Sequence, residues 1–312
     1  MNVKGDIVLR FSEIEVEVAS SDHSEIAFLF GPHVTRDTGS ASMASMRVEF
    51  TVPTRRQPDG GTPAEKEFLV RHDDGTPLLR RTFRGWGTMP PPLPPFAALG
   101  ERYALMRAVV LAKNSSTVAL VGGPYSETLS VASALAQRSW RFVSGQLLVF
   151  DLAEEQVVPC LLPLEARGRA ARRMRTAGLS EESLRTVPSP LGGEMLLVRP
   201  ESLGDVVPVD ARIALPSLVR LCGAVDDAVR MAPTEFTPHV WPREADTAFS
   251  AAPRYQLEIS SANGAEEAAG LIDTELTRKN DAERSRKKDD GCPDAPATGP
   301  AAPAGSTASL PT

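Results

Sequence analysis

The chain has 312 residues, of which 42% are hydrophobic and 24% are charged, and its formal net charge is −6. This composition is that of a globular protein with one sizeable core and room for a small accessory domain. The net acidity gives no electrostatic footprint for nucleic acid, and the sequence contains neither an apolar N-terminal leader nor a run of transmembrane length. We therefore expect a cytoplasmic protein without nucleic-acid or membrane partners.

The first 88 residues predict a small α+β module. Alternating apolar residues predict a strand over residues 6–17, and a short helix over residues 24–30 is predicted to end at Gly31-Pro32. No catalytic constellation occurs in the module, so we expect it to pack against a larger domain. Three further strands are predicted over residues 46–52, 67–71 and 78–83, the last two joined by a hairpin turn at residues 73–76.

Residues 89–260 predict the larger domain, which begins with a proline-rich segment over residues 89–96. Such a segment acts as a semi-rigid strut between domains or as a recognition ligand. A helix over residues 97–105 and a buried strand over residues 107–112 are predicted to follow.

The stretch over residues 117–151 has the plan of a phosphate-binding βαβ unit. An apolar run over residues 118–121 meets a turn at Gly122-Gly123-Pro124, a helix is predicted over residues 128–138, and a second apolar run ends at Asp151. We expect the two apolar runs to be neighbouring strands of a mixed sheet. The turn and helix should then lie at the carboxyl edge of that sheet.

The second half of this stretch carries a family resemblance in the run ALAQRSWRFVS, which LLV and Asp151 follow. It resembles the kinase domain of the HPr kinase/phosphorylase family, and residues 207–213 are similar to a late strand of that domain. The resemblance covers residues 90–220 and implies an HPr kinase-like α/β fold, with a P-loop-type mixed sheet and helices. It also implies a partner that presents a serine hydroxyl on a peptide or small protein.

The residues that would perform phosphoryl transfer are replaced. A working loop would read G-x-x-x-x-G-K-[ST] from Gly122, but Glu127 replaces the second glycine, Thr128 the lysine and Leu129 the hydroxyl residue. Thr128 brings no positive charge to the phosphates, Leu129 cannot bind Mg²⁺, and Glu127 repels a polyanion. The degenerate phosphate loop comprises Gly122, Gly123, Ser126, Glu127, Thr128, Leu129 and Ser130.

The resemblance further implies a pair of acidic residues after the serine of this motif, where Gly145 and Gln146 stand instead. Neither residue can bind a metal ion or take a proton from a substrate serine. We therefore expect no catalytic residue and no ATP or Mg²⁺ cofactor. The cysteines and histidines show no metal-ligand spacing, so no metal site is predicted either.

Two features could still bind an anion or a partner. Backbone N–H groups at residues 126–130 open a helix, which is either a weak anion site or only a helix capped by Ser126 or Thr128. The candidate side chains are Arg107, where relatives often carry histidine, and the cluster Arg169, Arg172 and Arg173 on one face of a basic helix. The alternative for the cluster is a solvated helix paired with Glu165, Glu181 and Glu182.

The remaining segments complete the expected fold. Strands are predicted over residues 195–198 and 206–213, and an apolar stripe predicts a helix over residues 216–231. Residues 261–312 predict a terminal helix over residues 266–279, followed by a disordered, low-complexity tail that begins with a charge run.

We therefore expect a pseudokinase, which acts as a binding or accessory protein for a peptide or small protein partner, with a peptide natural-product pathway as one setting. The first alternative is a residual serine-directed kinase or phosphotransferase. The second is a sensor that binds a phosphometabolite without turnover. No interface signature is readable, so a homo-oligomer stays open.

Overall fold

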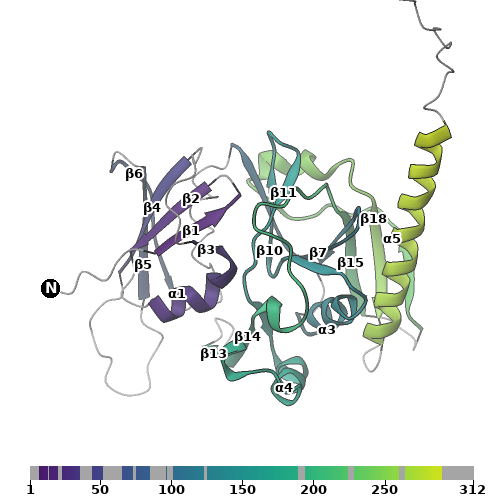
Figure 1. Cartoon of the computed structure of the whole chain (residues 1–312), viewed down its shortest axis with the longest axis horizontal. Coiled ribbons are helices and arrows are strands. Elements are labelled where there is room, and N and C mark those ends of the chain that lie inside the picture. The colour runs from purple at the N-terminus through teal and green to yellow at the C-terminus, as the bar shows by residue number, and fades with distance from the viewer. Residues whose placement is uncertain are drawn as a thin grey trace, which may run out of the picture.

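The computed structural model describes residues 7–12, 14–19, 23–35, 44–51, 65–72, 75–84, 96, 101–122, 125–188, 194–223, 228–259 and 264–289. The protein is a mixed α/β structure with a mixed central sheet and few helices (Figure 1). An N-terminal sheet lies on one side of the central sheet, and a small three-stranded sheet lies beside both (Figure 1).

The N-terminal sheet has the order β3-β1-β2-β4-β5-β6 and is accompanied by helix α1 (His23–Phe30). The single strand predicted over residues 6–17 is wrong, because Ser12 adopts a left-handed φ of 52° and turns the chain into an antiparallel pair. The predicted strands over residues 46–52, 67–71 and 78–83 are confirmed within a residue or two. The strands are β1 (Ile7–Phe11), β2 (Ile14–Ala19), β3 (Val34–Thr35), β4 (Ala44–Thr51), β5 (Glu65–His72) and β6 (Pro77–Arg84).

The central sheet has the order β11-β10-β7-β8-β15-β18-β16, and β9 and β17 also pair with β7. It is mixed because β8, β15 and β18 are parallel whereas the other pairs are antiparallel. Its strands are β7 (Tyr103–Lys113), β8 (Ser116–Val121), β9 (Arg141–Ser144), β10 (Leu147–Asp151), β11 (Gln156–Val158), β15 (Ser217–Gly223), β16 (Arg230–Pro233), β17 (Val240–Trp241) and β18 (Arg254–Ile259).

The long strand β7 organises this sheet and corrects one prediction. One edge of β7 pairs with β8, and the other pairs with β9 and β10. The prediction that the strands at residues 118–121 and 147–150 are neighbours is therefore wrong, because β7 lies between them. They run parallel to each other because each is antiparallel to β7. The prediction failed because β7 enters the sheet through a tight hairpin with β8, where Asn114 has a φ of 54°.

Two helix predictions are wrong in the parts that the structure describes. Of the helix predicted over residues 97–105, residues 97–100 lie outside the described residues and residues 103–105 belong to β7. The segment over residues 216–231 contains β15 and the start of β16, and residues 224–227 between them lie outside the described residues. Both β7 and β15 are covered on both faces, so their residues form nearly continuous apolar runs. Periodicity alone cannot distinguish such a strand from a buried helix.

Helices α3 (Tyr125–Ala136) and α5 (Gly264–Asp289) pack on one face of the central sheet, and 3₁₀ helix η4 (Arg243–Phe249) packs on the other. Helix α3 begins three residues earlier than predicted. Helix α5 continues to Asp289, so the predicted disorder is wrong for residues 280–289. The tail beyond Asp289 lies outside the described residues, as does most of the proline-rich segment.

The small sheet has the order β12-β14-β13 and carries helix α4 (Gly168–Thr176) beside it. The strand predicted over residues 206–213 is wrong: this segment is a loop with isolated bridges at Val206 and Ile213. The strands of the small sheet are β12 (Leu164–Ala166), β13 (Leu184–Pro188) and β14 (Glu194–Val198), and further 3₁₀ helices are Gly31–His33, Glu181–Ser183 and Pro200–Ser202.

The N-terminal module shares a hydrophobic core with the central and small sheets. His33 bridges them, because its Nδ1 donates to the Arg10 carbonyl at 2.9 Å and its Nε2 accepts from the Leu161 N–H at 2.9 Å. The ring stacks on Phe11 with centroids 4.2 Å apart. Burial lowers the pKa of His33 to about 4, with the hydrogen bond to Arg10 opposing this shift, so the neutral ring joins the two parts.

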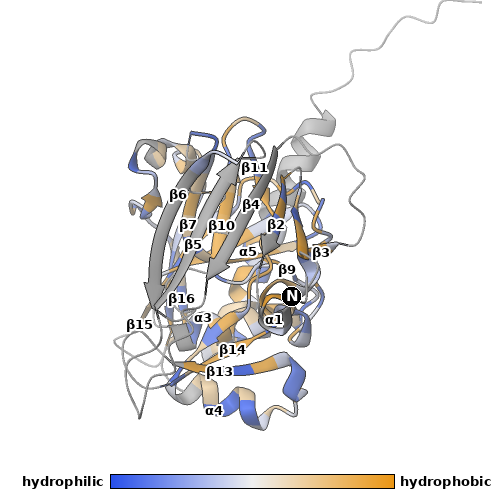
Figure 2. Ribbon diagram, turned by 90° about the vertical axis from the view of Figure 1, so that its left-hand side faces the viewer, coloured by the Kyte–Doolittle hydropathy of each residue, from blue (hydrophilic) through white to orange (hydrophobic). Residues whose placement is uncertain are grey.

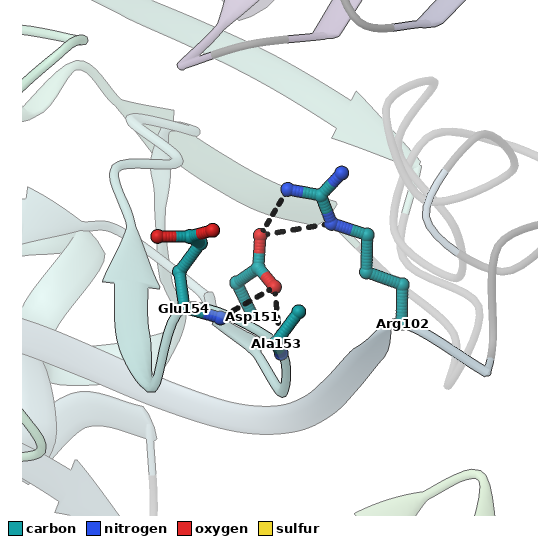
Figure 3. A network of polar contacts seen from close by, with 4 residues as sticks. All are labelled: Arg102, Asp151, Ala153 and Glu154. Carbon is teal, nitrogen blue, oxygen red and sulfur yellow. Dashed lines mark hydrogen bonds and ion pairs between the residues drawn. The ribbon is translucent and has the colours of Figure 1, made fainter.

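The edge hairpin of β10 and β11 is closed by a polar network around Asp151 (Figure 3). One carboxylate oxygen accepts from Nε and Nη2 of Arg102 at 3.0 and 2.7 Å, and the other accepts from the N–H groups of Ala153 and Glu154. Both carboxylate oxygens therefore accept hydrogen bonds that hold the turn and its neighbour Arg102 in place. Asp151, which the family resemblance includes, therefore has a structural role in this chain.

Candidate functional site

The degenerate phosphate loop leaves the carboxyl end of β8, as the sequence predicts. Gly122 has a left-handed φ of 72°, which glycine adopts without strain, and α3 begins at Tyr125. Gly123 and the side chain of Ser126 lie outside the described part of the structure. Within the described residues, a strand ends at Val121, Gly122 turns the chain, and a helix begins at Tyr125.

The side chains at the lysine and hydroxyl positions are used by the fold. Thr128 is 6% exposed, and its hydroxyl donates to the Gly122 carbonyl at 3.3 Å. It is therefore not the N-cap that the sequence suggested, because α3 begins before it. Leu129 is 1% exposed and packs in the core between α3 and the sheet. The next residue, Ser130, is partly exposed. The Thr128 hydroxyl is thus used by a backbone carbonyl of the turn, and the apolar side chain of Leu129 offers no metal ligand.

Glu127 places a carboxylate in the first turn of α3. The side chain is half-buried, and among the described residues its Oε2 is shielded from solvent without a hydrogen-bond partner. This desolvation raises the pKa of Glu127. An anion bound at the turn would meet this carboxylate, so Glu127 opposes a triphosphate when it is ionised.

Gly145 and Gln146 form a bulge between β9 and β10, opposite the middle of β7. A Cβ atom on Gly145 would lie 1.8 Å from the carbonyl oxygen of Leu162, so no larger side chain fits without a backbone shift. The side-chain amide of Gln146 donates to the carbonyl oxygen of Pro163. The segment at residues 160–163 thus occupies the space around the two positions where the family resemblance implies acids.

Arg107 lies between the Gly122 turn and this bulge. Its neighbour Ala108 pairs with Val121 on one side, and Arg107 itself pairs with Leu147 on the other. The structure therefore brings Arg107 together with both degenerate motifs.

The Arg107 guanidinium donates to Glu165 Oε2 at 3.0 Å, and Arg167 Nη2 lies 3.9 Å from the same oxygen. The Glu165 side chain is 2% exposed. Burial raises the pKa of Glu165, and the two arginines partly offset this shift. The sequence assigned Glu165 to the basic helix, but in the structure it pairs with Arg107 on a strand. This contact joins residues 58 positions apart, which no local pattern reveals.

Arg220 is a second residue at the turn that the sequence did not single out. It pairs with Val121 in the parallel ladder of β15 and β8, and its Cγ lies 3.9 Å from where a Cβ of Gly122 would be. Its guanidinium carbon lies 6.0 Å from the centroid of the Phe236 ring. The sequence predicted a helix over residues 216–231, and Arg220 comes to lie beside Gly122 only because this segment is a strand that pairs with β8.

The predicted basic helix is confirmed as α4, which contacts α3 and the small sheet. Arg172, Arg173 and Arg175 are exposed, whereas the side chain of Arg169 lies outside the described residues. The guanidinium of Arg175 lies 3.8 Å from the carboxylate of Glu194 rather than beside Glu181 or Glu182.

Within the described ranges, no helix is long and apolar enough to cross a membrane. Across the same residues, no group of three or more His, Cys, Asp or Glu side chains is arranged to hold a metal ion.

Comparisons with known proteins give structural likenesses but no match by sequence. No protein-family model and no curated protein sequence match this chain. Among solved structures, the chain is similar to the HPr(Ser) kinase/phosphatase from Coxiella burnetii, with 12% sequence identity and a TM-score of 0.31. The aligned region covers 60% of this chain and 95% of that protein.

Proposed function

We propose that this chain is a pseudokinase: a non-catalytic relative of the HPr kinase/phosphorylase family that binds a peptide or small protein in the cytoplasm. The resemblance of residues 134–151 to that family suggests the ancestry and the type of partner. In this proposal the cradle at Gly122 serves as a scaffold, and neither ATP nor Mg²⁺ takes part.

One observation carries the proposal: the fold occupies all four chemical positions, through the side chains of three residues and the close packing of the fourth, a glycine. Thr128 donates to a backbone carbonyl, Leu129 is in the core, Gly145 abuts the Leu162 carbonyl, and Gln146 holds the neighbouring segment. Losing one pre-organised transition-state donor lowers a rate by roughly 10²–10³. Replacing a lysine, a metal ligand and two acids together would leave little phosphotransfer.

The charge around Arg107 supports the same conclusion. A residual phosphotransferase would need a cation to replace the missing lysine, and Arg107 is the nearest candidate by sequence. Its guanidinium already donates to the buried Glu165 carboxylate at 3.0 Å. Moving it to a phosphate would leave a buried charge without that partner, which is strongly unfavourable.

Calorimetric titration with ATP·Mg²⁺ and a transfer assay with γ-labelled ATP test the proposal. We expect no binding heat at millimolar nucleotide and no labelled phosphate on serine-containing peptides or on the chain itself. Transfer of the label to any acceptor would overturn it. A Gln146→Ala variant provides a control, because it removes the Pro163 contact without introducing a catalytic group.

A phosphometabolite sensor is the second candidate, and the position of Arg220 beside Gly122 favours it. Titration with inorganic phosphate and pyrophosphate, without magnesium, distinguishes this function. Binding that is lost in Arg220→Gln and leaves the ligand intact would favour the sensor. If the chain binds neither phosphate nor pyrophosphate, the sensor function is refuted and the peptide-binding function remains.

A further inference from the structure

Helix α4 has one buried face and one basic face. Ala170 and Ala171 are 3% and 9% exposed and pack in the main core with Met174. Arg172, Arg173 and Arg175 are exposed, and we call these three residues the α4 arginine face. Figure 2 shows α4 at the lower end of the molecule, with hydrophilic residues along its outer ribbon. Because its apolar side is already buried, α4 presents these arginines from a fixed position.

This concentration of positive charge does not follow from the overall composition. Residues 167–188 contain six arginines and two glutamates, whereas the whole chain has a net charge of −6. Helix α4 itself contains no acidic residue. Adjacent arginines repel one another, so an exposed cluster of this kind is most stable when an anionic group neutralises it.

Arg175 shows how the face is held in place. Its Nη2 donates to the Thr186 hydroxyl of β13 at 3.2 Å and lies 3.8 Å from the Glu194 carboxylate of β14. The side chains of Arg175 and Glu194 are both substantially exposed, so the ion pair between them is weak. The guanidinium is thereby oriented by the small sheet, and a stronger carboxylate ligand could still displace Glu194.

We propose that the α4 arginine face docks a short acidic segment of the polypeptide partner, which rests on the peptide-binding function proposed above. Planar guanidinium groups bind carboxylates through paired hydrogen bonds, and three of them suit two or three Asp or Glu residues. Nucleic acid fits less well, because phosphate backbones are bound through many more cations than three arginines provide.

Fluorescence anisotropy with a labelled peptide of alternating Glu and Ala, added to the full chain, tests this assignment. We expect saturable binding at about 0.1 M salt that is lost at about 1 M, because the Debye length falls from roughly 10 to 3 Å. Each guanidinium should contribute about two- to five-fold in affinity. The double variant Arg172→Glu/Arg173→Glu should therefore weaken binding by roughly ten-fold or more.

The matched control is Arg212→Glu/Arg243→Glu, which changes the net charge equally at two exposed arginines outside α4. We expect its affinity to stay within about two-fold of the unmodified chain. Equal losses in both double variants, or no binding of the Glu-rich peptide at low salt, would overturn the proposal. Tighter binding of a single-stranded oligonucleotide than of the peptide would reassign the face to nucleic acid. These assays contain no nucleotide triphosphate, so their failure is separate from a failure of the pseudokinase proposal.

Discussion

Replacing Gly145 with alanine tests whether packing, rather than chance, keeps an acid from this position. The added Cβ would lie 1.8 Å from the Leu162 carbonyl oxygen and 2.9 Å from its carbonyl carbon, both below the 3.0 Å that Cβ contacts respect. The obstructing atoms are backbone. Leu162 itself is fully buried, and Cys160, two residues earlier, donates its N–H to the Val143 carbonyl at 2.9 Å, so the segment cannot move freely.

The magnitude follows from these contacts. Overpacking a well-packed interior costs about 1–3 kcal/mol, and breaking one neighbouring backbone hydrogen bond adds about 1 kcal/mol. We therefore expect Gly145→Ala to lower the free energy of unfolding by about 2–4 kcal/mol. Urea denaturation followed by circular dichroism measures this change. Gly145→Asp should be at least as destabilising, because it adds the same Cβ and a carboxylate.

Gly223 provides the matched control for this experiment. It is exposed, and a Cβ there would meet no atom within 4 Å. Gly223→Ala should leave stability unchanged or raise it by up to about 1 kcal/mol. If Gly145→Ala or Gly145→Asp proved as stable as the unmodified chain, the acid would not be excluded by packing. The structural basis of the pseudokinase proposal would then be refuted at this position.

Three further changes test the junctions around the site. As the pH falls from about 7 to about 5, the free energy of unfolding should fall by about 2 kcal/mol through His33. The reason is that His33 takes up a proton near pH 6.5 in the unfolded chain but only near pH 4 in the folded one. His33→Gln should flatten this pH dependence in urea titrations. Asp273→Ala should cost about 1–3 kcal/mol in a thermal melt, because the buried Trp140 Nε1 loses its acceptor at 2.8 Å. Arg107→Ala should destabilise the chain more at pH 8 than at pH 5: it raises further the already raised pKa of Glu165, so the folded state binds more protons and loses stability as the pH rises. An equal loss at both pH values would contradict this role of Arg107.

The sequence predicted the elements whose local signals are strong. Strands β4, β5 and β6 alternate in polarity and are bounded by turn residues, so their bounds could be read directly. The turn at Gly122 and the helix after it were also predicted, because a glycine break between an apolar run and a helical pattern has few structural solutions.

The neighbours of these strands could not be predicted in the same way. Strand β7 precedes the phosphate-loop stretch and forms a hairpin with β8, so it lies between β8 and β10, and the βαβ plan contains no signal for an intervening strand. Strand β15 carried an apolar stripe that also fits a helix, and only its parallel pairing with β8 settles its conformation. Burial on both faces removes the alternation that distinguishes strands from helices.

Of the candidate site, the sequence identified which chemical groups are missing but not what replaced them. Thr128 and Gly145 were singled out as departures from the motif, yet the Leu162 carbonyl beside Gly145 comes from a segment that the motif does not include. Glu165 and Arg220 reach the site through strand pairing between distant segments. Such contacts depend on the assembled sheet, so local spacing cannot reveal them.

The distribution of charge explains why the α4 arginine face, rather than Arg107, is the better place for a new partner. A ligand at Arg107 must displace a carboxylate that is 2% exposed, and the displaced Glu165 would then lose one of its charged partners within the protein. A ligand at Arg172 meets an exposed guanidinium and disturbs no buried group. A ligand at Arg172 therefore displaces no buried carboxylate of the kind that pairs with Arg107, so acidic-peptide affinity should respond to Arg172→Glu/Arg173→Glu far more than to Arg107→Ala.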